Sequence, residues 1–422
     1  MFGGGVMPGE PDPSDPIRGT SIRGQLQFWW RATRGAVCRT IEELIETHAA
    51  VWGNTRKASP VEIELRDIRV AEPRPCAQYV PSEQGKYRLD WQSPFRDSDP
   101  RHEGALPYVL FPFQGEPPSR RTAPEPEKPP ASFIESASFT LRVRFPGDVE
   151  DDVKTAVWAW VNFGGLGART RRGCGGLLCE SLAPKRFEDL ADWFRAGAGT
   201  ALALDRKWPT LSPHFLTHHE AAEPILIWNR LIGLWRYFRQ GAGFARNLGQ
   251  QANRPGRSRY PEPETIRETV HADRQESRHR RQDHMPAGGF PRAELGLPIV
   301  FHFQGRGEPN LTILYPRVNG AHADRMASPL ILKPLALADG RAVPLIMRLQ
   351  TPRLTDVELR SKDERTGVEE AIHKWGADAV RDKRFVQYPD SPLNGLTEEG
   401  SALEAFLALA RTPEYNFREG SR

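Results

Sequence analysis

Apolar positions near the N-terminus recur at helical spacing. Leu26, Trp29 and Trp30 fall on one face of a predicted helix over Ile22–Cys38, for which Ser21 is a suitable N-cap. This spacing favours the core for both tryptophans, ahead of a role in stacking on bases. The same periodicity predicts further helices at Ile41–Trp52, across Val153–Val161, at Glu223–Phe238 and across Leu403–Ala410.

Alternation of apolar and polar residues marks the strands, most clearly at Ser138–Phe145. There Phe139, Leu141 and Val143 point to one side and the residues between them to the other. Helices and strands are mixed in both halves of the chain, which predicts an α+β fold with helices on one face of each sheet. Further strands are predicted at Val61–Leu65, Leu106–Phe113, Ile299–Phe303, Leu311–Tyr315, Leu330–Leu335 and Leu345–Leu349.

Composition excludes several classes of protein. Glycine and proline number 37 and 38 among 422 residues, which is high for a domain but too low for a fibrous or wholly disordered chain. No apolar run approaches the ~18 residues of a membrane span. The N-terminus lacks the basic start and apolar stretch of a secretion signal. We therefore expect a cytoplasmic protein.

The four cysteines, Cys38, Cys76, Cys174 and Cys179, do not form the spaced pairs that a disulfide framework or a structural zinc site requires. Neither a metal nor a cofactor is expected.

The basic residues are mostly arginine and are separated from the acids. The chain carries 58 basic and 54 acidic side chains, for a net charge of +4. Between Asp15 and Glu42 every charged residue is an arginine, and between Asp152 and Glu180 the only charges are one lysine and three arginines. Guanidinium groups suit phosphate oxygens. A polyanion such as RNA is therefore a candidate partner, although such stretches can also be solvated faces.

One segment carries the most information. Residues 164–176 read GGLGARTRRGCGG, a pattern of Gly-x-Gly, five residues and Gly-x-Gly. Glycines allow backbone amides to approach a phosphate chain closely, and three arginines supply counter-charge. The segment follows a helix and precedes a predicted strand, so it is neither a dinucleotide-binding fingerprint nor a nucleoside-triphosphate loop. A Gly-rich turn with surface arginines is the alternative.

This pattern is similar to the signature loop of the RAMP superfamily of CRISPR-associated proteins. Other segments extend the resemblance, in order, to the family of RAMP subunits numbered one in the type III-B effector (Cmr) complex. They are FGGGVMPGEPDPSDPIRGTSIRGQLQFWWRATRG, VWGNTRKASPVEIEL, NFGGLGARTRRGCGGL, RPGRSRYPEPETIRE, FPRAELGLPIVFHF and RMASPLILKPL.

The resemblance implies two fused ferredoxin-like RAMP domains with long loop insertions, at residues 1–183 and 184–422. The first would contain the Gly-rich loop at 164–176 and the second a basic loop at 241–289. Such a subunit is not an enzyme; it contacts guide RNA, target RNA and neighbouring RAMP subunits. Family members usually begin with an apolar strand before the FGGG segment, and no such strand precedes it here.

The candidate RNA contacts combine basic groups with turns or aromatic residues. A helix start, a tight turn, the Gly-rich loop and a basic loop beside Tyr260 each supply some of them. Salt bridges to Asp12 and Asp15 are the alternative for the first arginines. The candidates are Arg18, Arg23, Arg31, Arg34, Arg56, Lys57, Gly165, Gly167, Arg169, Thr170, Arg171, Arg172, Gly173, Gly175, Arg257 and Arg259.

Two other functions stay open. Metal-independent RNA cleavage needs a histidine beside the scissile phosphate, and His271, His279 and His284 lie among arginines in the basic loop. The chain could therefore be an endoribonuclease that matures guide RNA, although no regular element holds these histidines in place. The arginines could also contact protein alone, in a structural cap.

Overall fold

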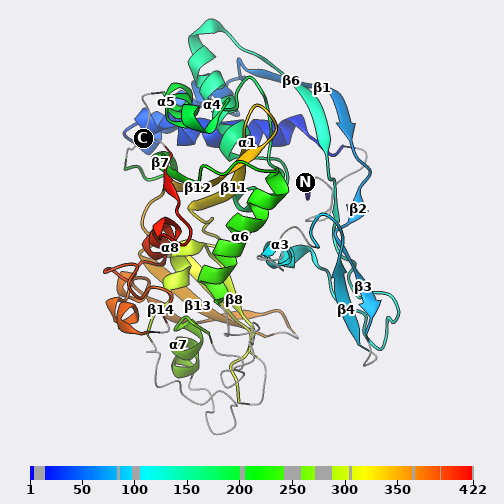
Figure 1. Ribbon diagram of the computed structural model, residues 1–422. Helices are drawn as coiled ribbons and strands as arrows, with labels where there is room; N and C mark the ends of the chain where they lie inside the picture. The colour runs from blue at the N-terminus through cyan, green and yellow to red at the C-terminus, as the bar shows by residue number, and fades with distance from the viewer. Residues whose placement is uncertain are drawn as a thin grey trace. The chain divides into compact units, whose positions relative to one another are not determined.

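The computed structural model describes residues 1–3, 15–82, 86–96, 105–199, 205–241, 258–270, 288–303, 307–363, 366–389 and 391–420. They form two compact units (Figure 1). Unit 1 contains Met1–Gly233, Leu330–Pro352 and Arg418–Arg422, and unit 2 contains Leu234–Pro329 and Arg353–Phe417. Both units mix helices and strands, as predicted. The ferredoxin-like topology of each half stays a prediction.

Two helices, α1 (Gly19–Ala32) and α4 (Glu150–Phe163), pack against each other in unit 1. Trp30 of α1 is fully buried, and its indole Nε1 donates a 2.6 Å hydrogen bond to Oδ1 of Asp152 in the first turn of α4. Trp29 is also buried, so neither tryptophan can stack on a base. Helix α1 starts before Ser21, with Arg18 at the N-cap position, so the predicted cap is wrong. The other helices that begin in unit 1 are α2 (Ile41–Trp52), α3 (Ala105–Leu110), α5 (Leu190–Ala198) and α6 (Pro224–Gln240).

The clearest predicted strand is confirmed. β6 (Ala137–Arg144) pairs with β1 (Glu62–Val70) in an antiparallel sheet. Phe139, Leu141 and Val143 pack against the core of α1 and α4, whereas the residues between them are exposed. The period of two therefore separates a buried face from a solvent face.

Strands from distant parts of the sequence form a second sheet in unit 1, in the order β11-β12-β7-β15. Phe215, Ile331 and Met347 from this sheet join the same apolar core as Trp29. The compact units therefore do not follow a single cut between residues 183 and 184, and that boundary stays a prediction about the two RAMP domains. The strands are β7 (Thr210–Thr217), β11 (Leu330–Ala336), β12 (Ala342–Gln350) and β15 (Arg418–Glu419).

The first residues of the chain are buried in a cluster of aromatic rings. Phe2 stacks on Phe113 with ring centroids 4.1 Å apart. Met1 and Ile134 exchange two backbone hydrogen bonds, as paired residues of antiparallel strands do. Among the described residues no strand precedes α1, and β6 pairs only with β1.

Two predicted strands in unit 1 are wrong. The run Leu106–Phe113 contains the helix α3 (Ala105–Leu110) and a 3-10 turn. Its buried residues Leu106, Val109 and Leu110 have helical spacing, and so short an apolar run does not distinguish the two structures by itself. The strand predicted directly after the Gly-rich segment, at Gly176–Cys179, is not a strand either. Two small antiparallel pairs complete unit 1: β2 (Arg74–Pro75) with β5 (Ser132–Phe133), and β3 (Ala77–Pro81) with β4 (Tyr87–Trp91).

Unit 2 is built on an antiparallel sheet with the order β10-β9-β13-β14, to which β8 adds by pairing with β9. Its core contains Ile266, Phe290, Leu314, Val357 and Leu359. Its elements are α7 (Glu262–Thr269), β8 (Ile299–Phe301), β9 (Thr312–Val318), β10 (Ala321–His322), β13 (Asp356–Lys362), β14 (Glu369–Trp375) and α8 (Ala402–Arg411).

Several arginines of unit 2 are committed to buried ion pairs. Arg292 lies 3.1 Å from Glu262 and over the ring of Tyr260. Arg267 lies 2.6 Å from Glu264, and both side chains are less than one-tenth exposed. Because a buried charge is costly unless it is paired, these arginines organise the interior of unit 2.

Candidate nucleic-acid interface

The Gly-rich loop, residues 164–176, leaves the C-terminal end of α4 and folds back on itself. The backbone N–H of Leu166 donates a 2.9 Å hydrogen bond to the carbonyl of Gly175, which closes the base of the loop. A 3-10 turn over Thr170–Arg172 forms its tip, flanked by Arg169 and Gly173, both in the left-handed conformation. The loop is therefore a compact folded segment.

Glycine is required where the two arms of this loop meet. Gly175 has a φ of +63°, and a Cβ there would lie 1.9 Å from the carbonyl oxygen of Leu166. Gly167 has a φ of +78°, and its Cβ would lie 2.0 Å from the carbonyl oxygen of Phe2. No residue with a side chain fits such approaches, so the spacing of these glycines follows from packing of the protein backbone.

The remaining glycines of the pattern are enclosed in the same way. A Cβ at Gly165 would lie 2.6 Å from the carbonyl oxygen of Gly175, and one at Gly173 would lie 2.5 Å from Nε1 of Trp228. These contacts explain the glycines without a phosphate. Contact between RNA and the loop amides, including that of Thr170, stays a prediction.

Arg172 holds the tip of the loop against unit 1. Its Nη1 donates a 2.7 Å hydrogen bond to the carbonyl of Leu330, at the start of β11. The carbonyl of Arg172 accepts a 2.6 Å hydrogen bond from Nε1 of Trp228 on α6. The guanidinium of Arg172 therefore has a structural role, and its contact with RNA stays a prediction.

Lys333 holds the other arm of the loop. This residue of β11 is 1% exposed, and its Nζ donates a 3.0 Å hydrogen bond to the carbonyl of Gly164. Burial lowers the pKa of the ammonium from 10.5 to about 7. Gly164 is the C-cap of α4, where the helix carries partial negative charge, so a cation is favourably placed there.

The other two cations of the loop differ in environment. Arg171 is half-buried, with its guanidinium 5.6 Å from the ring centroid of Phe28 on α1, and burial lowers its pKa. Arg169 is exposed, and its φ of +57° places it in a conformation that residues other than glycine rarely adopt. The loop therefore presents one exposed arginine in a sterically unusual conformation.

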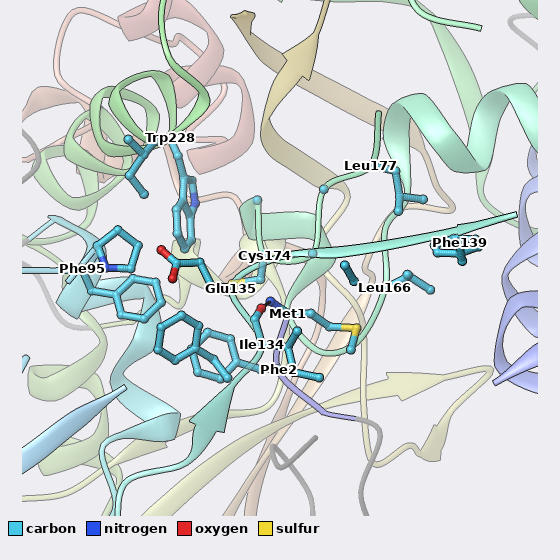
Figure 2. Close-up of a pocket in the computed structure, with 17 residues that line it drawn as sticks. Met1, Phe2, Phe95, Ile134, Glu135, Phe139, Leu166, Cys174, Leu177 and Trp228 are labelled. Carbon is cyan, nitrogen blue, oxygen red and sulfur yellow. Dashed lines mark hydrogen bonds between the residues drawn. The ribbon is translucent and has the colours of Figure 1, made fainter. Parts of the chain in front are cut away.

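A cavity of about 230 Å³ lies beside the loop in unit 1 (Figure 2). Its lining is mostly apolar and includes Phe2, Leu166, Leu177 and Trp228. Figure 2 shows the carboxylate of Glu135 on the same side of the cavity as Phe95 and Trp228, away from Leu166 and Leu177.

The four arginines predicted near the first helix all contact protein. Arg23 and Arg31 contact neutral groups of unit 1, whereas Arg18 and Arg34 lie beside acids. Arg18 lies 3.5 Å from Asp15, Arg23 donates hydrogen bonds of 3.0 and 3.2 Å to the carbonyl of Val61, Arg31 lies 3.4 Å from Nε2 of His48, and Arg34 lies 3.8 Å from Asp152.

The turn before β1 is different, because its cations are exposed. Arg56 and Lys57 are exposed, and their backbone N–H groups each donate a 2.8 Å hydrogen bond to Oδ1 of Asn54. The Asn54 side chain thereby fixes the turn and leaves both basic side chains at the surface.

The basic loop of the second half gives a mixed result. Arg257 and most of residues 241–289 lie outside the described residues. Arg259 is half-buried, and its Nη1 donates a 3.1 Å hydrogen bond to the carbonyl of Tyr237. Tyr260 is 2% exposed and its hydroxyl donates a 3.0 Å hydrogen bond to the carbonyl of Phe238, so its ring belongs to the core of the protein.

The histidine site of the alternative function lies in the same loop: His271, His279 and His284 fall outside the described residues. His218 and His219 lie side by side with ring centroids 4.3 Å apart, and burial lowers the pKa of His218.

In the described part of the chain, no group of His, Cys, Asp and Glu side chains could hold a metal ion. No helix there is long and apolar enough to cross a membrane.

The residues that position the loop escaped sequence-based prediction. Lys333, Leu330 and Trp228 act on it from positions far along the chain. Lys333 had one local signal, since it is the only charged residue in the apolar run Leu330–Leu335, where a lysine needs a partner.

Residues 1–177 match the family model described as the RAMP superfamily. This confirms the resemblance over that part of the chain. A search of curated proteins gives no match.

Solved structures with weak similarity include Cmr1 from Pyrococcus furiosus in its apo form, at 13% identity and a TM-score of 0.37, covering 80% of this chain and 82% of that one. Two chains from the type III-B Cmr-beta complex, each covering 79% of this chain and 88% of theirs, are also similar. The one bound to cognate target RNA has 12% identity and a TM-score of 0.39. The one bound to cognate target RNA and AMPPnP, in state 2 with ssDNA present, has 10% identity and a TM-score of 0.37.

Adjacent glycines provide a matched test of the loop geometry. Gly175→Ala should lower the free energy of unfolding by about 2–4 kcal/mol, because the new Cβ meets the carbonyl of Leu166 in a left-handed conformation. Gly176→Ala should change it by less than about 0.5 kcal/mol, because the nearest atom to its Cβ is 4.0 Å away. Denaturant unfolding of both variants checks this. Equal losses would contradict the described packing.

Lys333 gives a pH-dependent prediction. Its pKa is 10.5 when unfolded and about 7 when folded, so below pH 7 both states carry the proton and the full cost of burying it is present. Between the two values the unfolded state binds more protons, and stability relative to Lys333→Met should rise by about 1.4 kcal/mol per pH unit. Unfolding titrations of both proteins from neutral to alkaline pH measure this. A constant difference would mean that Lys333 titrates normally.

Proposed function

We propose that this chain, whose residues 1–177 are a RAMP-superfamily region, is a non-catalytic RNA-binding subunit of a type III-B CRISPR (Cmr) effector complex. In this role it contacts guide RNA and target RNA beside other RAMP subunits, in the cytoplasm. The ordered sequence motifs and the family match support the assignment to this class.

The main support for RNA binding is the exposed position of Arg169 on the folded loop. The loop around it is tied down by hydrogen bonds from Lys333 and Trp228, while Arg169 itself is exposed in the left-handed conformation. A conformation unfavourable for an arginine is maintained only when its surroundings over-determine it, and such positions cluster at functional sites. A guanidinium on a rigid tip suits a phosphate oxygen.

The exposed face of the β1–β6 sheet favours phosphate contact over base stacking. An RNA-recognition sheet presents aromatic rings to unstacked bases. Here the exposed positions carry charges in cross-strand pairs, with Arg144 3.2 Å from Glu62 and Arg142 3.8 Å from Glu64. RNA affinity is therefore expected to come from cations on loops, with Arg56 and Lys57 as a second exposed group, and to depend little on sequence.

A single substitution tests this mode of binding. Arg169→Ala should weaken binding of a labelled unstructured RNA, because one phosphate contact is lost, and should reduce the slope of log affinity against log salt by about 0.7. Arg121→Ala is the control and should change neither quantity, because Arg121 is an exposed arginine of the same unit, on the segment between α3 and β5. Fluorescence anisotropy at several salt concentrations measures both.

This design is sharper than replacing all three loop arginines. Because Arg172 anchors the loop to Leu330, its removal would alter loop structure as well as charge. Unchanged affinity and salt dependence in Arg169→Ala, with the protein folded, would contradict the proposed role of the loop.

The non-catalytic part of the proposal has its own test. The purified chain, incubated with labelled CRISPR repeat RNA in EDTA, should leave the RNA intact, because metal-independent cleavage needs a histidine held beside the scissile phosphate and the sequence predicts no regular element around His271, His279 and His284. Specific cleavage that is lost when His271, His279 or His284 is replaced would overturn the assignment in favour of an endoribonuclease.

A further inference from the structure

Lys333 is a buried cation that the proposed RNA contact does not use directly. Its ammonium lies at the C-terminal end of α4, on the carbonyl of Gly164. The last carbonyls of a helix lack partners within the helix and carry its negative partial charge. We propose that Lys333 is a positioning residue whose ammonium fixes where the Gly-rich loop leaves α4, and thereby how Arg169 meets RNA. This rests on the proposed RNA-binding function.

Where the Gly-rich loop leaves α4, Lys333 links the loop to the strand β11. Trp160, within α4 itself, donates a 3.2 Å hydrogen bond from Nε1 to the carbonyl of Gly165, so two successive carbonyls are satisfied by buried donors. On the opposite arm Arg172 donates to Leu330, three residues before Lys333 on β11. The strand thus contacts the loop at two points, and at each point a cation is the donor.

Charge, rather than bulk, explains a lysine at this position. Burial is the cause of its lowered pKa, with no carboxylate contributing. Methionine would fill similar space without the cost of burying an ammonium. The acids of α4 lie in its first turn, at the opposite end of the helix, and the cations of the loop are Arg169, Arg171 and Arg172. Loss of the Lys333 proton therefore removes the charge that attracts the helix end, while the arginines stay charged.

Lys333→Met and Lys333→Gln form the test, with Lys154→Met as the matched control. Lys154 is exposed on α4, one turn after Glu150, with which it forms an ion pair. Native-state trypsin cleavage after Arg169 and Arg171, measured without RNA, reports the anchoring of the loop. Both Lys333 variants should be cleaved there at least about fivefold faster than the wild type and should bind unstructured RNA at least about fivefold more weakly. The control should match the wild type in both assays.

Two further readouts separate positioning from a general structural role. The melting temperature of Lys333→Met should equal or exceed that of the wild type at pH 6.5, because a buried charge has been removed. RNA affinity of the wild type should weaken as pH rises through the pKa of Lys333, at about 7, whereas that of Lys333→Met should not. Wild-type cleavage and affinity in both Lys333 variants would overturn the proposal, as would faster cleavage throughout the chain with a lower melting temperature. Faster loop cleavage in a chain that never binds RNA would support the anchoring role of Lys333 and overturn the RNA-binding function.

Discussion

The contact between the carbonyl of Leu166 and Gly175 determines the shape of the Gly-rich loop. Because a Cβ at Gly175 would lie 1.9 Å from that oxygen, the two arms can close only with glycine. Closure places Thr170–Arg172 in a short turn at the tip and Arg169 in the left-handed conformation beside it. Lys333 and Trp228 donate hydrogen bonds to carbonyls of the loop, whose closed shape this contact determines.

Many of the arginines are satisfied by protein groups other than carboxylates, although Arg18 and Arg34 lie beside acids. Arg23, Arg172 and Arg259 donate to backbone carbonyls, and Arg171 lies over an aromatic ring. A guanidinium has five donors, so it can be satisfied by carbonyls and rings without a carboxylate. An acid-free run of arginines is thus weak evidence for RNA by itself. The stronger candidates are those that remain exposed on rigid turns.

Sequence patterns predicted the parts of the fold that depend on neighbouring residues. The alternation at Ser138–Phe145 and the helical spacing of Val153–Val161 correspond to β6 and α4. The error at Leu106–Phe113 arose because an apolar run of eight residues fits a strand or a buried helix equally well. The anchors of the loop could not be predicted, since Leu330 and Lys333 meet it only through tertiary folding. Likewise, the spacing of glycines in the sequence does not show whether a ligand or another segment of the protein backbone approaches them.

The central claim is that RNA lies against the tip of the Gly-rich loop. Ultraviolet crosslinking of the full chain to a bound single-stranded RNA, followed by mass spectrometry of the adducts, tests it most directly. The account predicts adducts on the peptide that contains Arg169, in amounts that fall as salt rises. Adducts confined to unit 2, with none on residues 164–176, would contradict it.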